Sequence, residues 1–259
     1  MELVKPHIPN DWGNLLEINL SNSVSGNNLV VRETLEDLDV ISNQLESMGI
    51  KVHRHDIDKK SLFIINDKII LNKDIDFPFT TENIVQSPYS FSSHNVLRFG
   101  NQLVFLMFED TPEEGINWLQ EYCLNTFDDS YKVHIVPNHN STESLNTSFC
   151  YLNSDYVLVN PTRFNHQNCP QIFDELNVII CPEPYPTQTK YSGLYELDWM
   201  HLNVLVINQK LCMVEENQSL LIKELNSKGI NTIPYRFRHL RKFPAGLHSF
   251  TLPIIREDN

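Results

Sequence analysis

Apolar positions along the chain repeat a pattern of helix, turn and strand. In the clearest copy, Leu38, Ile41 and Leu45 belong to a series at helical spacing, and Gly49 follows where a left-handed cap is expected. Residues 50–53 then read as a strand. Three further copies are predicted, with helices beginning at Thr111, over residues 170–176 and over residues 219–228, and with strands over residues 131–137, over residues 178–181 and through Ile233.

Short apolar strands precede these copies and complete a repeated unit. A hairpin about Asn66 and Asp67 is predicted between the first and second copies, without a clear helix, and fits a degenerate fifth unit. Repeats of one supersecondary unit usually close or stack, because a single unit cannot bury its apolar face alone. We interpret residues 1–259 as one α/β domain with preceding strands over residues 15–20, 96–108, 156–160 and 203–213.

The charge balance disfavours a nucleic-acid partner. The net charge is −13, whereas binding a phosphate backbone requires clustered Lys and Arg. The only dense basic run contains Arg236, Arg238, Arg241 and Lys242, and a solvated loop or strand edge explains it more simply.

Cysteine and hydropathy patterns place limits on cofactors and location. The five cysteines are scattered, and no pair has metal-type spacing, so we expect neither a metal nor another cofactor. The N-terminus has no apolar signal core, and no stretch approaches membrane-spanning length. We therefore expect a cytoplasmic protein with reduced thiols and no membrane association.

The C-terminal motif over residues 243–254 carries the strongest clue. A glycine turn at Pro244, Ala245 and Gly246 is followed by His248, Ser249 and a short strand, and this stretch resembles the C-terminal signature of the amidinotransferases. Other segments resemble motifs of the glycine and inosamine amidinotransferases in the same order, over residues 91–100, 131–135, 143–149, 159–163 and 199–205. The resemblance implies the pentein architecture, an α/β propeller of five ββαβ modules with pseudo-fivefold symmetry.

The same resemblance implies that the family's chemistry is lost. The family attacks the guanidino carbon of arginine with a cysteine thiolate, and the matching residue here is Ser249. The family's general acid/base histidine corresponds to Ser144, and two of its aspartates correspond to Asn95 and Asn146. Attack on a guanidine carbon needs a thiolate and a proton relay to the leaving amine. Four concerted substitutions remove both.

Two other residues of these motifs are candidates for contact with a ligand. His248 adjoins Ser249, but neighbours in an extended strand point to opposite faces, so we expect His248 to point away from the hydroxyl. Ser144, Asn146 and Ser148 alternate with apolar residues and predict a strand with one polar face. Arg163 matches an arginine that contacts the substrate carboxylate in the family; a surface ion pair is the alternative.

The sequence thus predicts a catalytically degenerate amidinotransferase-like protein. It would bind a small amino-acid-like ligand through Asn95, Asn146, Arg163, His248 and Ser249, or bind a protein partner, including a second copy of itself. The alternative is an active enzyme of the family that uses chemistry without cysteine on an amino-acid or guanidino substrate. A purely structural subunit is the third possibility.

Overall fold

The computed structural model describes residues 6–22, 24, 26–57, 62–71, 83–89, 95–107, 113–127, 131–137, 145–164, 169–184, 199–240 and 246–257. Within these residues the α-helices are α1 (Asn28–Ser47), α2 (Glu113–Thr126) and α3 (Ser219–Ser227). The 3-10 turns include η3 (Leu145–Thr147), η4 (Gln171–Phe173), η5 (Met200–Leu202) and η7 (Leu247–Phe250). The strands are β1 (Leu15–Leu20), β2 (Lys51–His53), β3 (Leu62–Ile65), β4 (Lys68–Leu71), β5 (Ile84–Gln86), β6 (Val96–Phe99), β7 (Gln102–Met107), β8 (Lys132–Pro137), β9 (Phe149–Tyr151), β10 (Tyr156–Val159), β11 (Asn177–Ile180), β12 (Leu205–Asn208), β13 (Leu211–Glu215), β14 (Asn231–Tyr235) and β15 (Thr251–Arg256).

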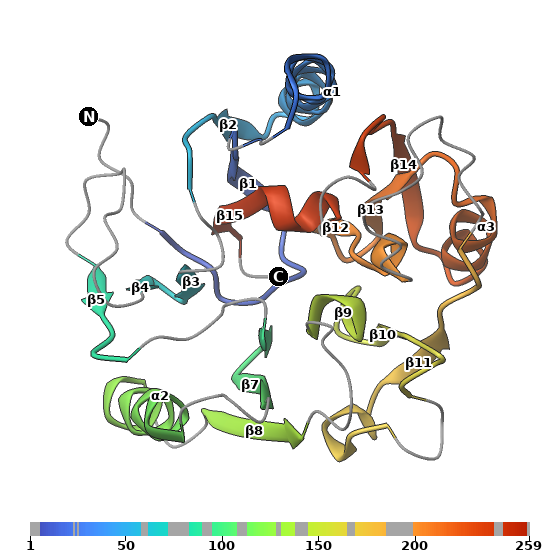
Figure 1. Cartoon of the computed structure of the whole chain (residues 1–259). Helices are drawn as coiled ribbons and strands as arrows, with labels where there is room; N and C mark the ends of the chain where they lie inside the picture. Colours follow the sequence, from blue (N-terminus) through green and yellow to red (C-terminus); the bar gives the residue numbers. More distant parts are fainter. Residues whose placement is uncertain are drawn as a thin grey trace.

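The strands form five three-stranded sheets that surround a common centre (Figure 1). In chain order these modules are β15-β1-β2, β3-β4-β5, β6-β7-β8, β9-β10-β11 and β12-β13-β14, called modules 1 to 5 below. In every module the middle strand pairs antiparallel with the first strand and parallel with the third. The predicted fivefold α/β repeat is therefore confirmed.

Module 1 closes the ring with strands from both ends of the chain. Strand β1 pairs with β15, with Leu20 opposite Thr251 and Leu15 opposite Arg256. Its other neighbour is β2, reached through α1. Parallel neighbours need such a crossover, and α2 and α3 provide the same connection in modules 3 and 5.

Within the part of the chain that the structure describes, the core is divided into five apolar clusters, one between each pair of neighbouring modules. For example, Leu38 of α1 and Leu247 of η7 belong to the cluster between modules 1 and 5. Val104 of β7 and Val157 of β10 belong to the cluster between modules 3 and 4. The remaining clusters join modules 4 and 5, 1 and 2, and 2 and 3. Each module therefore buries its faces against both neighbours, as a closed repeat requires.

Local signals in the sequence set the ends of helix α1. Asn27 is its N-cap, and the Asn27 side chain accepts a hydrogen bond from Val30 N at 3.0 Å. The helix thus begins at Asn28, before the predicted periodic series. Its buried positions include Leu38, Ile41 and Leu45, and Gly49 follows with φ of +83°, as the sequence predicts.

The hairpin about Asn66 is confirmed, since β3 and β4 pair with Ile65 opposite Lys68. Asn66 itself has φ of +52°, a conformation that Asn tolerates better than most residues. Residues 72–82, which connect β4 to β5, lie outside the described residues.

The predicted helix over residues 170–176 is wrong, because only the single turn η4 forms there. Such a short segment gains few helical hydrogen bonds after the cost of nucleation. Phe173 is nevertheless buried, so the turn still covers the sheet of module 4.

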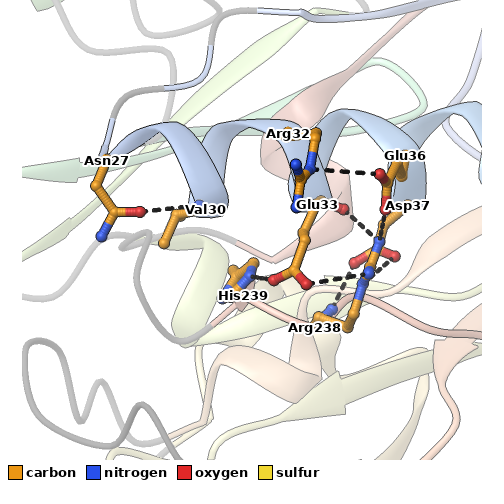
Figure 2. A network of polar contacts seen from close by, with 8 residues as sticks. All are labelled: Asn27, Val30, Arg32, Glu33, Glu36, Asp37, Arg238 and His239. Atoms are coloured by element: carbon orange, nitrogen blue, oxygen red, sulfur yellow. Dashed lines mark hydrogen bonds and ion pairs between the residues drawn. The ribbon is translucent and has the colours of Figure 1, made fainter.

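A polar network joins α1 to the turn after β14 (Figure 2). Arg238 Nε donates to Asp37 Oδ1 at 2.8 Å, and Arg238 Nη2 donates to Glu36 Oε2 at 2.8 Å. The Glu33 carboxylate lies 2.6 Å from His239 Nε2 and 3.5 Å from Arg238 Nη1. The network thus links module 1 to the segment that leads toward η7.

The rest of the basic run agrees with its predicted solvated position where it is described. Arg236 is exposed and lies 3.7 Å from Glu216, whereas Arg241 and Lys242 fall outside the described residues. Among the helices that the structure describes, none is long and apolar enough to cross a membrane.

Candidate ligand-binding site

A cavity of about 130 Å³ lies where the five modules meet. The first strand of every module contributes to its wall, namely β3, β6, β9, β12 and β15. Because the modules share one topology and surround one centre, these five strands run in the same direction along the cavity. We call the end at which they begin the entrance end, and the end at which they finish the closed end.

Ser249 lies at the entrance end, just before β15. It belongs to η7 rather than to a strand, so the predicted alternation of His248 and Ser249 across a strand is wrong. The backbone turns here because Ser249 N donates to Gly246 O at 3.0 Å. Gly246 packs so closely on Asn203 that an added Cβ would lie 2.7 Å from Asn203 Cβ.

Asn203, two residues before β12, is the described side chain that holds Ser249. Its Nδ2 donates to Ser249 Oγ at 3.3 Å. Among the described residues, no histidine or carboxylate forms a hydrogen bond with this hydroxyl. Asn203 and His248 both line the cavity. The sequence did not single out Asn203, although it lies within one of the segments that resemble the family motifs.

The other predicted entrance residues are placed less fully. Asn95 is half-buried directly before β6 and is not part of the described cavity wall. Asn146 lies in η3, and its side chain lies outside what the structure describes, as does all of Ser144. The predicted polar strand through these residues is wrong for its described part, because η3 occupies residues 145–147 and β9 begins only at Phe149. Asn160 stabilises this turn by donating to Thr147 O at 2.8 Å.

Arg163 reaches the entrance end from the turn after β10. Its Nη1 donates to Ser148 Oγ, and Ser148 directly precedes Phe149, which lines the cavity. Arg163 is half-buried and is not itself among the residues that form the cavity wall. The structure therefore places Arg163 against Ser148, the neighbour of a wall residue, and not in the cavity wall itself.

An N-terminal segment, residues 6–14, covers the closed end. Ile8 pairs with Asn66 after β3, and Arg98 of β6 donates to the carbonyl groups of Ile8 and Pro9. Arg256 of β15 donates to Gly13 O at 2.7 Å. Two buried arginines therefore fix this segment, which the sequence pattern did not assign to the site.

Comparison with known proteins gives the family relationship. No family model matches the sequence. The chain is 31% identical over 166 residues to inosamine-phosphate amidinotransferase 1 of Streptomyces glaucescens, a match that covers 64% of this chain and 47% of that protein. The solved inosamine-phosphate amidinotransferase of Streptomyces griseus superposes with a TM-score of 0.84 and 21% identity, over 100% of this chain and 98% of that structure. The chain is homologous to the amidinotransferases. It spans about half the length of such relatives in the sequence match, whereas the shared fold extends through the whole chain.

The same pentein-type fold recurs in more distant proteins. A cysteine-to-serine mutant of DDAH from Pseudomonas aeruginosa, solved in complex with citrulline, superposes with a TM-score of 0.68 and 12% identity. This match covers 92% of this chain and 99% of that structure, and it concerns the fold alone.

In this amidinotransferase homologue, a buried Cys–His contact lies away from the cavity wall. Cys181 Sγ is 3.2 Å from His201 Nε2, which also lies 2.9 Å from Pro182 O. Since a carbonyl oxygen only accepts, Nε2 carries the proton and is not a base for the thiol. Burial also raises the pKa of Cys181 well above its usual value, so the thiol is protonated.

Cys150 of β9 is the described cysteine that lines the cavity. Its Sγ lies 3.7 Å from Tyr151 O and 3.9 Å from Val204 O, both neutral acceptors. Among the described residues, no group of three or more His, Cys, Asp or Glu side chains is arranged to hold a metal ion.

Proposed function

We propose that this chain is a pseudoenzyme, an amidinotransferase relative that binds a small amino-acid-like ligand and does not transfer an amidino group. The observation that carries the proposal is the environment of Ser249. This residue takes the place of the family's cysteine in the C-terminal motif, and its hydroxyl is held by the Asn203 amide.

The chemical reason is the lack of both a thiolate and a base at this position. A serine hydroxyl is a poor nucleophile at neutral pH unless a neighbouring base removes its proton. The Asn203 amide has no basic nitrogen and cannot fill that role. The motif positions Ser144, Asn95 and Asn146 likewise provide no histidine or carboxylate for a proton relay.

Retained binding is supported by the cavity itself and by the DDAH mutant described above. That mutant carries serine in place of a cysteine and is still complexed with citrulline. By analogy, serine in this fold is compatible with an occupied ligand site. We place polar groups of the ligand, including its α-carboxylate, at the entrance end, near Asn95, Asn146, Arg163, His248 and Ser249.

Charge at the entrance end favours particular amino acids. Asn95 and Asn146 are neutral where the family motifs have aspartates, so hydrogen bonds to a cationic guanidinium lose their charge assistance. Arg163, by contrast, is suited to a ligand carboxylate. The proposed site therefore prefers neutral or anionic amino acids to arginine.

The test is a pair of measurements on the purified protein. Release of ornithine, citrulline or urea from arginine should not exceed that of a Ser249→Ala control, and Cys150→Ala should give the same background. Thermal-shift or calorimetric titration with citrulline and arginine should show tighter binding of citrulline. Turnover of arginine that depends on Ser249 would favour the active-enzyme alternative and overturn the proposal.

The remaining expectations belong to the same proposal. We propose that the chain acts as a single domain in the cytoplasm, alone, as a homo-oligomer or with a protein partner. Co-purification and light scattering of the purified chain would distinguish these states.

A further inference from the structure

Two buried arginines lie in the wall of the cavity at its closed end. Arg98 is 6% exposed and Arg256 is 2% exposed, and both line the cavity. Burying a guanidinium is costly unless it is paired or fully hydrogen-bonded. The partners of these two side chains therefore indicate which kind of ligand group the closed end can bind.

Every described partner of the two guanidinium groups is electrically neutral. Arg98 donates to the carbonyl oxygens of Gly100, Ile8 and Pro9 and to Asn66 Oδ1. Arg256 donates to the carbonyl oxygens of Gly13 and Val206 at 2.7 Å, with a longer contact of 3.5 Å to Ile207 O. Within the described part of the chain, neither arginine forms an ion pair with a carboxylate.

Asp11 of the N-terminal segment is the acidic residue of the cavity wall. Burial lowers the pKa of Arg256 to about 10, and the charge of Asp11 acts in the opposite direction, so the two groups are close enough to interact. With two guanidinium charges and one carboxylate charge, the wall retains one positive charge. A monoanion at this end would offset it.

Two donor groups at this end have no hydrogen-bond partner among the described residues. They are Arg256 Nε and Tyr151 OH, both fully buried, and both side chains line the cavity. Burial, with the charge of Asp11, raises the pKa of Tyr151 well above its usual value, so the phenol keeps its proton and remains a donor. A buried donor without an acceptor is destabilising, because it has lost its hydrogen bonds to water.

At the other end, Asn203 presents an acceptor. Its Oδ1 has no hydrogen-bond partner among the described residues, whereas its Nδ2 is used by Ser249. Val206, whose carbonyl Arg256 contacts, is three positions after Asn203 in the chain, which corresponds to at most about 10 Å even for a fully extended backbone. Between them the wall is largely apolar and includes Leu62, Ile64 and Leu252.

We propose that the cavity binds an amino acid with a carboxylate side chain, oriented with that carboxylate toward Arg256 and Tyr151 at the closed end. This inference rests on the proposed function and specifies its ligand. The α-ammonium group would donate to Asn203 Oδ1, and the α-carboxylate would face Arg163 at the rim. The short aliphatic part would pack on Leu62, Ile64 and Leu252. A cavity of about 130 Å³ is slightly smaller than the ~150 Å³ cavity that holds benzene, so it suits a short side chain.

The decisive experiment compares ligands that have the same shape and different charge. Calorimetric titration of the purified chain with glutamate, glutamine, aspartate and asparagine isolates the side-chain carboxylate from size. We expect each acid to bind at least about fivefold tighter than its amide, since charge-assisted hydrogen bonds exceed neutral ones by roughly 1 kcal/mol. Amides that bind as tightly as the acids would overturn the inference and leave the proposed function standing.

Three variants test the contacts at the two ends of the ligand independently. Asp11→Asn removes the repelling carboxylate and should tighten glutamate binding several-fold, with little change for glutamine. Tyr151→Phe removes a hydroxyl without a described protein partner, so it should keep the fold stable and weaken glutamate binding selectively. Arg163→Ala at the rim should weaken both ligands alike.

The outcomes distinguish the two proposals. A glutamate-to-glutamine ratio unaffected by both Asp11→Asn and Tyr151→Phe would overturn the inward orientation. Arginine turnover dependent on Ser249 would instead overturn the proposed function. Absence of binding by all four amino acids would overturn the inference, whereas the titration with citrulline decides the ligand-binding part of the proposed function.

Discussion

Asn203 Nδ2 donates a hydrogen bond to Ser249 Oγ over 3.3 Å and so links the turn before β12 to the turn before β15. These two turns begin the first strands of module 5 and module 1, which are neighbours in the ring. The hydroxyl is thus held by a neutral amide at the entrance to the cavity. Changing the residue at this position tests whether the environment, as well as the nucleophile, has been lost.

Ser249→Cys alone should not restore amidino transfer. A thiol at this position would still lack a histidine to protonate the leaving amine. We expect no arginine turnover and no rapid labelling by a haloacetamidine, measured by mass spectrometry of the intact protein. Cys150→Ala is the background of choice, because Cys150 also lines the cavity. Rapid labelling of Cys at position 249 would reveal a base that activates it.

Arg163→Ala should weaken the binding of an amino-acid ligand by about 2 kcal/mol, or roughly 30-fold, the range for hydrogen bonds to a charged group. Arg163 donates to the Ser148 hydroxyl, so a thermal melt of Arg163→Ala is needed to separate lost binding from lost stability. Calorimetry with citrulline provides the measurement, and Arg163→Lys is the conservative control. Equal affinities in wild type and Arg163→Ala would remove Arg163 from the site.

Asp37→Asn should destabilise the protein by about 2 kcal/mol, because Asp37 is 6% exposed and accepts hydrogen bonds from Arg238 N and Arg238 Nε. Asp39 of the same helix is the matched control. The Asp39 side chain forms an ion pair with Arg54 but is itself mostly exposed to solvent. Asp39→Asn should therefore lower the free energy of unfolding by less than about 1 kcal/mol. Urea denaturation of both variants gives the comparison, and equal costs would contradict this account of the network.

Glu33 should make stability dependent on acid pH. A hydrogen bond with His239, together with the charges of Arg238, His239 and Arg32, lowers the pKa of Glu33 below its ordinary value of 4.5 despite partial desolvation. A lowered folded-state pKa stabilises the protein above the unfolded-state pKa, and this contribution disappears as pH falls through the folded-state pKa.

Glu33→Gln should therefore reduce the melting temperature at neutral pH. Its difference from wild type should shrink as the pH is lowered below 4.5. Thermal melts of the two proteins across this range provide the test. A difference that stays constant with pH would show that the ionised carboxylate is not the stabilising form.

Gly246→Ala should displace the turn that carries Ser249. An added Cβ would lie 2.7 Å from Asn203 Cβ, and overpacking of this kind costs about 1–3 kcal/mol. Gly229→Ala is the control for stability, since Gly229 has φ of +77° and open space around it. Both variants should melt earlier, but only Gly246→Ala should lose ligand binding. Retained binding would show that Gly246 does not position the site.

The sequence by itself determined the local elements and the family relationship. Helix α1 ends before Gly49 and the hairpin turns at Asn66 because these residues tolerate positive φ, a property that neighbours in the chain cannot alter. The motif around Ser249 resembles the amidinotransferase signature, and the homology agrees with it. Because such patterns depend only on residues that are close in the sequence, they can be recognised without knowledge of the fold.

Short segments were decided by their tertiary surroundings. Residues 145–147 and 247–250 form 3-10 turns where the sequence predicted strands. Both turns are held by residues that are not their neighbours in the sequence. Asn160 donates to Thr147 O in the first turn, and Gly246, which begins the second, packs on Asn203 of another module.

Only the tertiary structure brought Asp11, Arg98, Asn203 and Arg256 to one cavity. Asp11 and Arg256 lie at opposite ends of the sequence, and no periodicity connects them. They meet because β15 pairs with β1 and closes the ring, and because burial of apolar faces between neighbouring modules directs the five first strands toward one centre. The charge of the closed end is therefore a property of ring closure, and the sequence pattern alone could not predict it.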